Sequence, residues 1–130
     1  MNKTRGVIFD FNGTLFFDSE LHIEAFRHCF GSRNMPVPDN SFIVRNIFGR
    51  TTAEIYRNNF NPDPTQQEID AFIAEKEGTY IQLCKKSEDH THLCPGAEKL
   101  LDTLAQMSIP VAIATGSELE TVKFYMDPCM

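Results

Sequence analysis

Apolar residues along the chain follow two different spacings, which together predict a mixed α/β fold. Two short continuous apolar runs, residues 6–11 (GVIFDF) and 111–114 (VAIA), are typical of buried strands in a parallel sheet. Between them, apolar residues recur at intervals of three and four, which predicts helices. We therefore expect two parallel strands joined by a mostly helical connection.

Helix boundaries follow from start signals in the sequence. In a capping box, a Ser or Thr and a Glu three residues later satisfy each other's backbone amides at the start of a helix. The pattern occurs at Thr51 with Glu54, at Thr65 with Glu68, and at Ser117 with Glu120. Helices are predicted at about residues 19–30, 39–46, 51–60, 65–84 and 97–104, and from residue 117 onward.

The connection between the strands is much longer than a simple crossover helix requires. Its additional helices are predicted to form a lid over the carboxyl ends of the strands, where open α/β sheets bind ligands. We expect residues 1–16 and 93–130 to form a partial, doubly wound (Rossmann-like) α/β core. Residues 17–92 would form an inserted all-helical cap.

Lys76 interrupts the apolar stripe of the helix predicted at residues 65–84. From the pattern alone, the simplest interpretation is that its stem packs on the helix while its ammonium group extends into solvent.

Composition indicates a globular protein, with 42% hydrophobic and 23% charged residues. The net charge of −6 and the lack of a Lys/Arg run argue against nucleic-acid and anionic-membrane partners. Without a signal peptide or a membrane-spanning segment in the sequence, we expect a cytoplasmic protein. Its four cysteines form no C-x-x-C pair and are expected to be buried or inert thiols.

A short segment, "HTHLC", places His90, His92 and Cys94 at a spacing that could bind a transition metal. A fourth ligand is missing nearby, and the segment lies in a polar connection. A solvated loop is the preferred interpretation.

Candidate chemistry lies where the two strands end. Asp10 follows the first strand, and a carboxylate there can attack a phosphoryl group with the help of a divalent cation, expected to be Mg²⁺. The backbone amides of Gly13 and Thr14 could face phosphate oxygens. Thr115 and Gly116 would add a hydroxyl and an amide from the second strand.

The combined motifs are more specific. "FDFNGTLFFDSE" resembles the first motif of the haloacid dehalogenase superfamily, D-x-D-G-T-L after an apolar strand, and "VAIATGSE" resembles its second. The resemblance extends over essentially the whole chain and implies a helical cap inserted after the first motif. It implies that Asp10 is the nucleophile and a Mg²⁺ ligand, that the backbone carbonyl of Asn12 is a second ligand, and that Thr115 binds phosphate.

Cap residues can be matched to members that resemble hexose-phosphate mutases. The resemblance implies substrate contacts from His22, from the loop Gly49, Arg50, Thr51 and Thr52, and from Lys76, with Tyr80 on the same cap helix. An orientation of Lys76 toward the active site is the alternative to extension into solvent. For each of these cap residues, an ordinary surface or packing role remains the competing interpretation.

Two departures from the family pattern bear on function. The family's general acid and base is an aspartate two residues after the nucleophile, and here it is Asn12, which cannot shuttle protons. The later motifs, a phosphate-holding lysine and an acidic metal-binding cluster, would lie beyond Met130. The sequence is therefore interpreted as the amino-terminal portion of a longer hydrolase.

We expect a Mg²⁺-dependent hydrolase that acts on a small phosphorylated metabolite through an aspartyl-phosphate intermediate. The alternative is a non-catalytic domain that binds phosphate or a partner, in line with Asn12. A dehalogenase is disfavoured because that class has a tyrosine at this position. If the partial core exposes its sheet edges, these edges could pair with a second chain in an oligomer.

Overall fold

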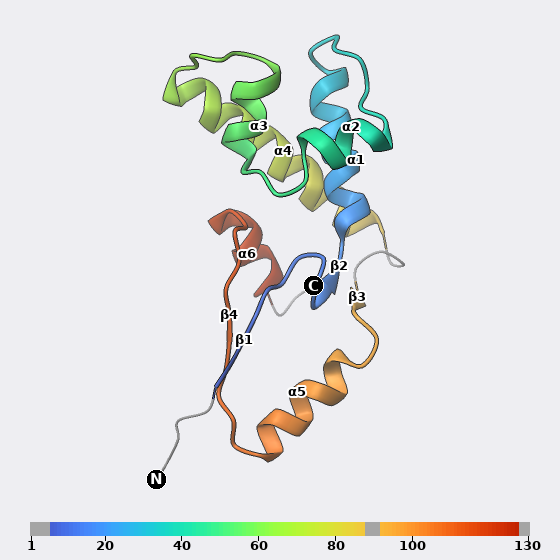
Figure 1. Ribbon diagram of the computed structural model, residues 1–130, viewed down its shortest axis with the longest axis vertical. Helices are drawn as coiled ribbons and strands as arrows, with labels where there is room; N and C mark the ends of the chain where they lie inside the picture. Colours follow the sequence, from blue (N-terminus) through green and yellow to red (C-terminus); the bar gives the residue numbers. More distant parts are fainter. Residues whose placement is uncertain (1–5, 88–91, 128–130) are drawn as a thin grey trace.

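The computed structural model describes residues 6–87 and 92–127. It is elongated: a group of helices lies at one end, paired strands and another helix lie at the other, and the last helix sits beside their junction (Figure 1). In chain order the elements are β1 (Val7–Phe9), β2 (Phe16–Phe17), α1 (Ser19–Gly31), α2 (Asn40–Asn46), α3 (Thr52–Asn59), α4 (Gln66–Lys86), β3 (His92–Leu93), α5 (Ala97–Gln106), β4 (Val111–Ile113) and α6 (Leu119–Tyr125).

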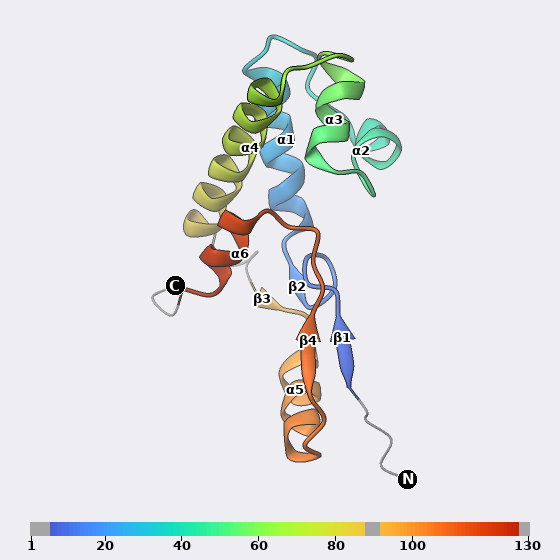
Figure 2. The ribbon, with the colours of Figure 1, turned by 90° about the vertical axis from the view of Figure 1, so that its left-hand side faces the viewer.

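The strands predicted from the two apolar runs, β1 and β4, pair in parallel, as expected. Val7 lies opposite Val111 and Phe9 opposite Ile113, and the two strands run side by side in both ribbon views (Figures 1 and 2). Because the strands are parallel, their carboxyl ends meet at the same edge of the sheet. Asp10 and the residues that follow β4 are thereby brought together.

A second pair of strands, β2 and β3, was not predicted. Phe16 pairs with Leu93 and Phe17 with His92 in antiparallel register, where the chain enters and leaves the helical insert formed by α1–α4. The pair fixes the two ends of the insert next to each other. Each strand has two residues, too few for alternation to reveal it from the sequence.

The helical insert has an aromatic core. Phe26 and Phe30 of α1 pack with Phe72 of α4, and Ile43 of α2 and Ile55 of α3 complete this buried cluster. Burial of each such side chain contributes roughly 1.5–3 kcal/mol relative to exposure. The apolar spacing that predicted the helices therefore also fixes how they pack.

The capping boxes predicted at the starts of α3 and α4 are confirmed. In each, the Thr hydroxyl accepts a hydrogen bond from the Glu backbone amide while the Glu carboxylate accepts one from the Thr amide. The residues are Thr51 with Glu54 and Thr65 with Glu68.

The capping box predicted for α6 is wrong. The residue before α6 is Glu118, and no side-chain hydrogen bond caps this helix. The Ser117 hydroxyl instead donates to the side chain of Asn12. A tertiary acceptor therefore replaces the local one.

The expectation that both strands are buried is also wrong. Side chains of Ile8, Val111 and Ile113 are 72%, 41% and 52% exposed, respectively. In the described part of the chain, the parallel sheet has two strands, so much of its apolar surface faces solvent. No helix in residues 6–87 or 92–127 is both long and apolar enough to cross a membrane.

Candidate functional site

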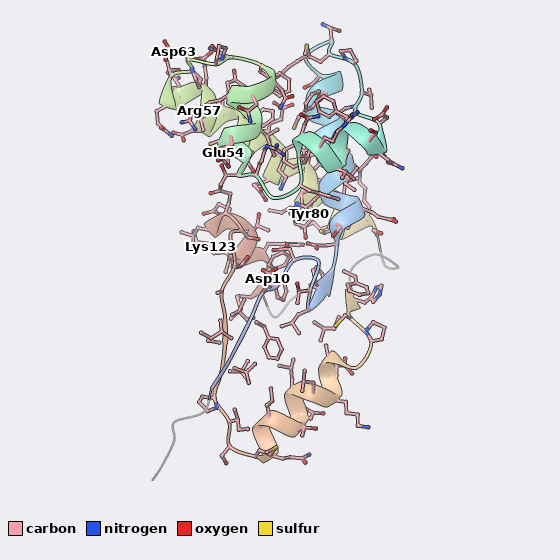
Figure 3. The ribbon with its side chains drawn as sticks, viewed as in Figure 1. Asp10, Glu54, Arg57, Asp63, Tyr80 and Lys123 are labelled. Carbon is pink, nitrogen blue, oxygen red and sulfur yellow. The ribbon has the colours of Figure 1, made fainter. Side chains whose placement is uncertain are left out.

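A cavity of about 430 Å³ opens between the strand ends and the helical insert. Figure 3 shows Asp10 at this junction, below the helices of the insert. The predicted site residues that line the cavity are Asp10, Asn12, His22, Gly49, Arg50, Thr51, Thr52, Lys76, Thr115 and Gly116. The fold thus brings together residues that lie far apart in the sequence.

Asp10 occupies the first position after β1. Its Oδ1 accepts a hydrogen bond from the Phe11 backbone amide at 2.9 Å, and its Oδ2 accepts one from the Thr14 hydroxyl at 3.3 Å. The residue is solvent-exposed. A carboxylate held in this way at a cavity wall can attack an electrophile or bind a hard cation.

The segment after β4 supplies hydroxyl groups beside Asp10. The backbone amide of Ser117 donates to the Thr115 hydroxyl at 3.1 Å, which holds this segment in a turn. Ser117 was not predicted as a site residue, but it also lines the cavity. In the sequence, Ser117 was interpreted as part of a capping box, so it was not considered as a site residue.

Asn12 is held by hydrogen bonds at both ends of its amide. Its Nδ2 donates to Asp18 Oδ2 at 2.5 Å and to the Tyr125 hydroxyl at 2.7 Å. Its Oδ1 accepts from the hydroxyls of Ser117 at 2.5 Å and Thr115 at 3.4 Å. The amide is fixed in place, yet it cannot deliver or take up a proton.

Asp18 is the principal buried polar residue that the sequence reasoning missed. It is 1% exposed. Its carboxylate accepts hydrogen bonds from Asn12 Nδ2, the Tyr80 hydroxyl at 2.5 Å, His22 Nε2 at 3.1 Å, the Tyr125 hydroxyl at 3.2 Å and the Gly13 amide at 3.3 Å. Burial opposes ionisation, but the hydrogen bonds from His22, Tyr80 and Asn12 outweigh it, so the pKa of Asp18 lies below its ordinary value.

Asp18 directly precedes α1, a position at which aspartate commonly caps a helix. Its side chain makes no capping hydrogen bond to the backbone amides at the start of α1. The carboxylate is used instead for tertiary contacts between the strand end, α1, α4 and α6.

Two tyrosines complete this cluster, Tyr80, which is buried, and Tyr125, which is half-buried. The hydroxyls of Tyr80 and Tyr125 lie 2.5 Å apart. Burial raises the pKa of both phenols above the ordinary value, so both remain neutral at physiological pH. Each can therefore donate a proton in a hydrogen bond while it accepts another.

Lys76 is buried, and the expectation that its ammonium group reaches solvent is wrong. It is 4% exposed, its Nζ lies 2.8 Å from His22 Nδ1, and it donates to Glu77 Oε1 at 2.7 Å. The second Glu77 oxygen accepts from the hydroxyl of Thr121 in α6. Polar partners at the cavity replace the water that the ammonium group would otherwise need.

The loop between α2 and α3 forms another wall of the cavity. Gly49 adopts a φ of 73°, a left-handed conformation that glycine tolerates better than other residues. Arg50 and Thr52 follow it along the cavity wall. The Arg50 guanidinium donates to the Phe48 carbonyl at 3.5 Å and is exposed, so it can reach an anionic ligand.

Gly13 and Thr14 lie outside this cavity. Their amides donate to Phe16 O at 2.8 Å and Phe11 O at 3.1 Å and so hold the turn after β1. Gly13 has a φ of 70°, and a Cβ there would lie 3.1 Å from Ser19 Oγ. Phosphate binding by these two amides stays a prediction.

The residues at the strand end supply oxygen donors suited to magnesium. Mg²⁺ prefers oxygen ligands and is commonly held by one or two carboxylates together with water and phosphate. The Asp10 carboxylate and the Asn12 backbone carbonyl fit that donor set.

Within residues 6–87 and 92–127, no three His, Cys, Asp or Glu side chains are grouped to hold a metal. His90 of the "HTHLC" segment lies outside the described residues.

The cysteines in the described ranges are free thiols. Cys29 and Cys84 are buried, and burial raises the pKa of both, to about 12 for Cys29. Both thiols are therefore poor nucleophiles at neutral pH. Cys94 is partly buried, and Cys129 lies outside the described residues.

The site therefore consists of a carboxylate at the end of a parallel strand, hydroxyls at the end of its neighbour and a helical insert above them. Residues 7–128 match the family model described as haloacid dehalogenase-like hydrolase. The chain therefore belongs to the haloacid dehalogenase-like hydrolases.

Solved structures and a curated relative agree with this assignment. A family IA haloacid dehalogenase hydrolase from Entamoeba histolytica is 32% identical with a TM-score of 0.81, over 94% of this chain and 53% of that one. Protein CbbY of Rhodobacter capsulatus is 25% identical over 87% of this chain and 51% of its own length. CbbY of Rhodobacter sphaeroides, solved in complex with phosphate, is 23% identical with a TM-score of 0.75, over 94% and 55% of the two chains. The chain thus spans about half the length of these relatives.

Proposed function

We propose that this chain carries the nucleophile and the cap of a Mg²⁺-dependent hydrolase of small phosphorylated metabolites. The observation that carries the proposal is the cavity, which Asp10 shares with Thr115 and with the cationic side chains of Arg50 and Lys76. Phosphate binding by the CbbY relative supports a phosphorylated ligand, as does the complex of a CbbY variant with xylulose-1,5-bisphosphate. Residues 17–92 would act as the cap that selects the ligand.

In the proposed reaction, an Asp10 oxygen bonds to phosphorus while the bond from phosphorus to the leaving oxygen breaks. Water then hydrolyses the resulting aspartyl-phosphate and releases inorganic phosphate. A bound Mg²⁺ would offset the negative charge of the carboxylate and the phosphate. The Thr115 hydroxyl would hold a phosphate oxygen, and Arg50 would hold an anionic group at the loop.

A non-catalytic phosphate-binding domain is the second candidate, favoured by Asn12. Its amide is engaged by Asp18, Tyr125 and Ser117 and has no proton to give to a leaving group. Such a domain would bind phosphate but would not form a covalent adduct on Asp10.

Beryllium fluoride separates the two candidates, because it mimics a phosphoryl group attached to a carboxylate. With Mg²⁺ present, we expect a bound fluorine NMR signal that Asp10→Asn abolishes. The control is Asp63→Asn, which changes an exposed carboxylate at the far end of the insert (Figure 3) and should leave the signal intact. Binding of inorganic phosphate without a beryllium fluoride signal would favour the non-catalytic domain.

A further inference from the structure

We propose that Asp18 is a positioning residue that fixes the orientation of the Asn12 amide and, together with Lys76, the tautomer of His22, and so sets which atoms these side chains present to a phosphorylated ligand. The inference rests on the proposed function of the cavity. Asp18 itself does not line that cavity, whereas Asn12 and His22 do. Its action is therefore indirect.

The first part of the argument concerns the Asn12 amide. An ionised carboxylate can only accept hydrogen bonds, so the atom that faces Asp18 Oδ2 at 2.5 Å must be the NH₂ group. The amide oxygen is then turned the opposite way, toward the hydroxyls of Ser117 and Thr115. Position 12 consequently presents an acceptor on the phosphate-binding side.

The second part concerns His22, which lies between a donor and an acceptor. The Lys76 ammonium group can only donate, so His22 Nδ1, 2.8 Å away, must accept. Nε2 then carries the ring proton and donates it to Asp18 at 3.1 Å. Stacking on the Tyr80 ring, with centroids 3.9 Å apart, fixes the plane of the imidazole.

The tyrosine hydroxyls extend the same directed network. Asn12 Nδ2 donates to Tyr125, at 2.7 Å, and the two tyrosine hydroxyls bond to each other. Tyr80 donates to Asp18 at 2.5 Å. The donor chains that run through Asn12, His22 and Tyr80 therefore end at the Asp18 carboxylate, which has no proton to donate.

An Asp18→Asn substitution keeps the shape of the side chain but introduces donor hydrogens. The NH₂ group of Asn12 and Nε2 of His22 would then face an amide that can donate as well as accept hydrogen bonds. Lys76 still donates to Nδ1 in this variant, so we expect the tautomer of His22 protonated at Nδ1 to rise to a detectable minor population. We expect hydrogen exchange of the Asn12 side-chain amide to accelerate on the order of tenfold, because a hydrogen bond to a charged group is lost.

Nitrogen NMR of the 130-residue chain at fixed neutral pH tests this directly. The wild type should show a protonated Nε2 and an unprotonated Nδ1 in His22. A protonated Nδ1 in the wild type would overturn the proposal without any variant, so a poorly folded Asp18→Asn does not block the test.

The matched control is Tyr80→Phe, which removes one donor to Asp18 and leaves the carboxylate in place. In Tyr80→Phe, His22 should keep its tautomer and the Asn12 side-chain amide should exchange as slowly as in the wild type. In Asp18→Asn, a second tautomer should appear and the exchange should accelerate. Equal changes in the two variants would mean that Asp18 has only a structural role. Titration with inorganic phosphate, run separately on the wild type, tests the proposed function, so the two ideas can fail independently.

Discussion

The side-chain nitrogen of Asn12 lies 2.5 Å from Oδ2 of the buried Asp18, and this contact joins the end of β1 to the start of the helical insert. In the family pattern, position 12 carries an aspartate that handles protons. Here a neutral amide occupies the position and donates to a carboxylate. The contact therefore bears on both the chemistry and the stability of the site.

Substitution of Asn12 by aspartate should increase turnover in a manner that depends on the leaving group. General acid–base catalysis contributes typically about 10²–10⁴-fold to the rate. In a protein that contains this chain and turns over an alkyl phosphate, kcat should therefore rise by a factor in that range, with little change in KM. Acetyl phosphate serves as the control, because acetate leaves without a proton, and its rate should change much less. Phosphate release measures both.

Deamidation of the Asn12–Gly13 pair would create the same aspartate in the wild type, so the mass at position 12 must be verified first. Equal rates of the verified wild type and Asn12→Asp on the alkyl phosphate would show that position 12 is not the proton shuttle of the proposed reaction.

Asn12→Asp should also lower the stability of the fold at alkaline pH. Two carboxylates at hydrogen-bonding distance cannot both ionise easily, so the pKa of the pair in the folded state is raised. A raised folded-state pKa means that stability is retained at low pH and lost as the pH rises through it. We expect Asn12→Asp to lower the free energy of unfolding by about 2 kcal/mol at pH 8 and by less at pH 5 in urea titrations.

The double variant Asn12→Asp with Asp18→Asn restores one amide and one carboxylate in reversed order. It should recover most of the stability lost at pH 8. Additive losses from the two single changes would argue against direct coupling between these positions.

Replacement of Lys76 by methionine should be strongly destabilising. The change leaves Glu77 buried without its cation, and breaking a buried ion pair typically costs about 3–5 kcal/mol. The double change Lys76→Met with Glu77→Gln removes both charges and should cost much less, as measured by denaturant unfolding. If Lys76 also reaches the ligand, affinity for inorganic phosphate should fall in the double variant.

The ion pair between Arg33 of α1 and Glu75 of α4 should make the free energy of unfolding fall as the pH is lowered into the acid range. The Arg33 guanidinium, 2.6 Å away, lowers the pKa of Glu75, against a smaller effect of burial. A lowered folded-state pKa contributes stability above the unfolded value and loses it as the pH falls through the folded value. Glu75→Gln should therefore cost about 1 kcal/mol at pH 7, given partial exposure, and almost nothing at pH 2.

The matched control is Glu24→Gln, because Glu24 pairs with Arg27 at 3.4 Å on the exposed surface. Its effect should stay within a few tenths of a kcal/mol at both pH values. A pH-independent effect of Glu75→Gln would show that the link between α1 and α4 is not ionic in origin.

Hydrogen exchange should separate the strands from the helical insert. Amides in residues 6–11 and 111–114 should exchange faster than those in residues 65–84, because the described sheet has two exposed strands whereas α4 packs in an apolar core. Mass spectrometry of peptides from each segment would measure this. Slow exchange in both strands of a monomer would contradict the prediction, and slow exchange in an oligomer would mean that a second chain covers the sheet.

The sequence alone determined the elements whose signals are local. Thr51 and Thr65 lie three residues before the glutamates that they pair with, so their capping boxes could be read directly. The two apolar runs predicted β1 and β4, and the motif around Asp10 indicated a site at the end of β1, where Asp10 lines the cavity. Apolar spacing likewise predicted the long helix α4, in which Phe72 is buried.

Only the tertiary structure decided the partners of the polar side chains. Tyr125 is 113 residues from Asn12, and Thr121 is 44 from Glu77, so no local pattern records these contacts. Lys76 and Asp18 each fit an ordinary local role, as a solvent-facing lysine and a helix cap. Their burial depends on the path of the whole chain, because a polar group is stable inside a protein only where distant segments supply its hydrogen-bond partners.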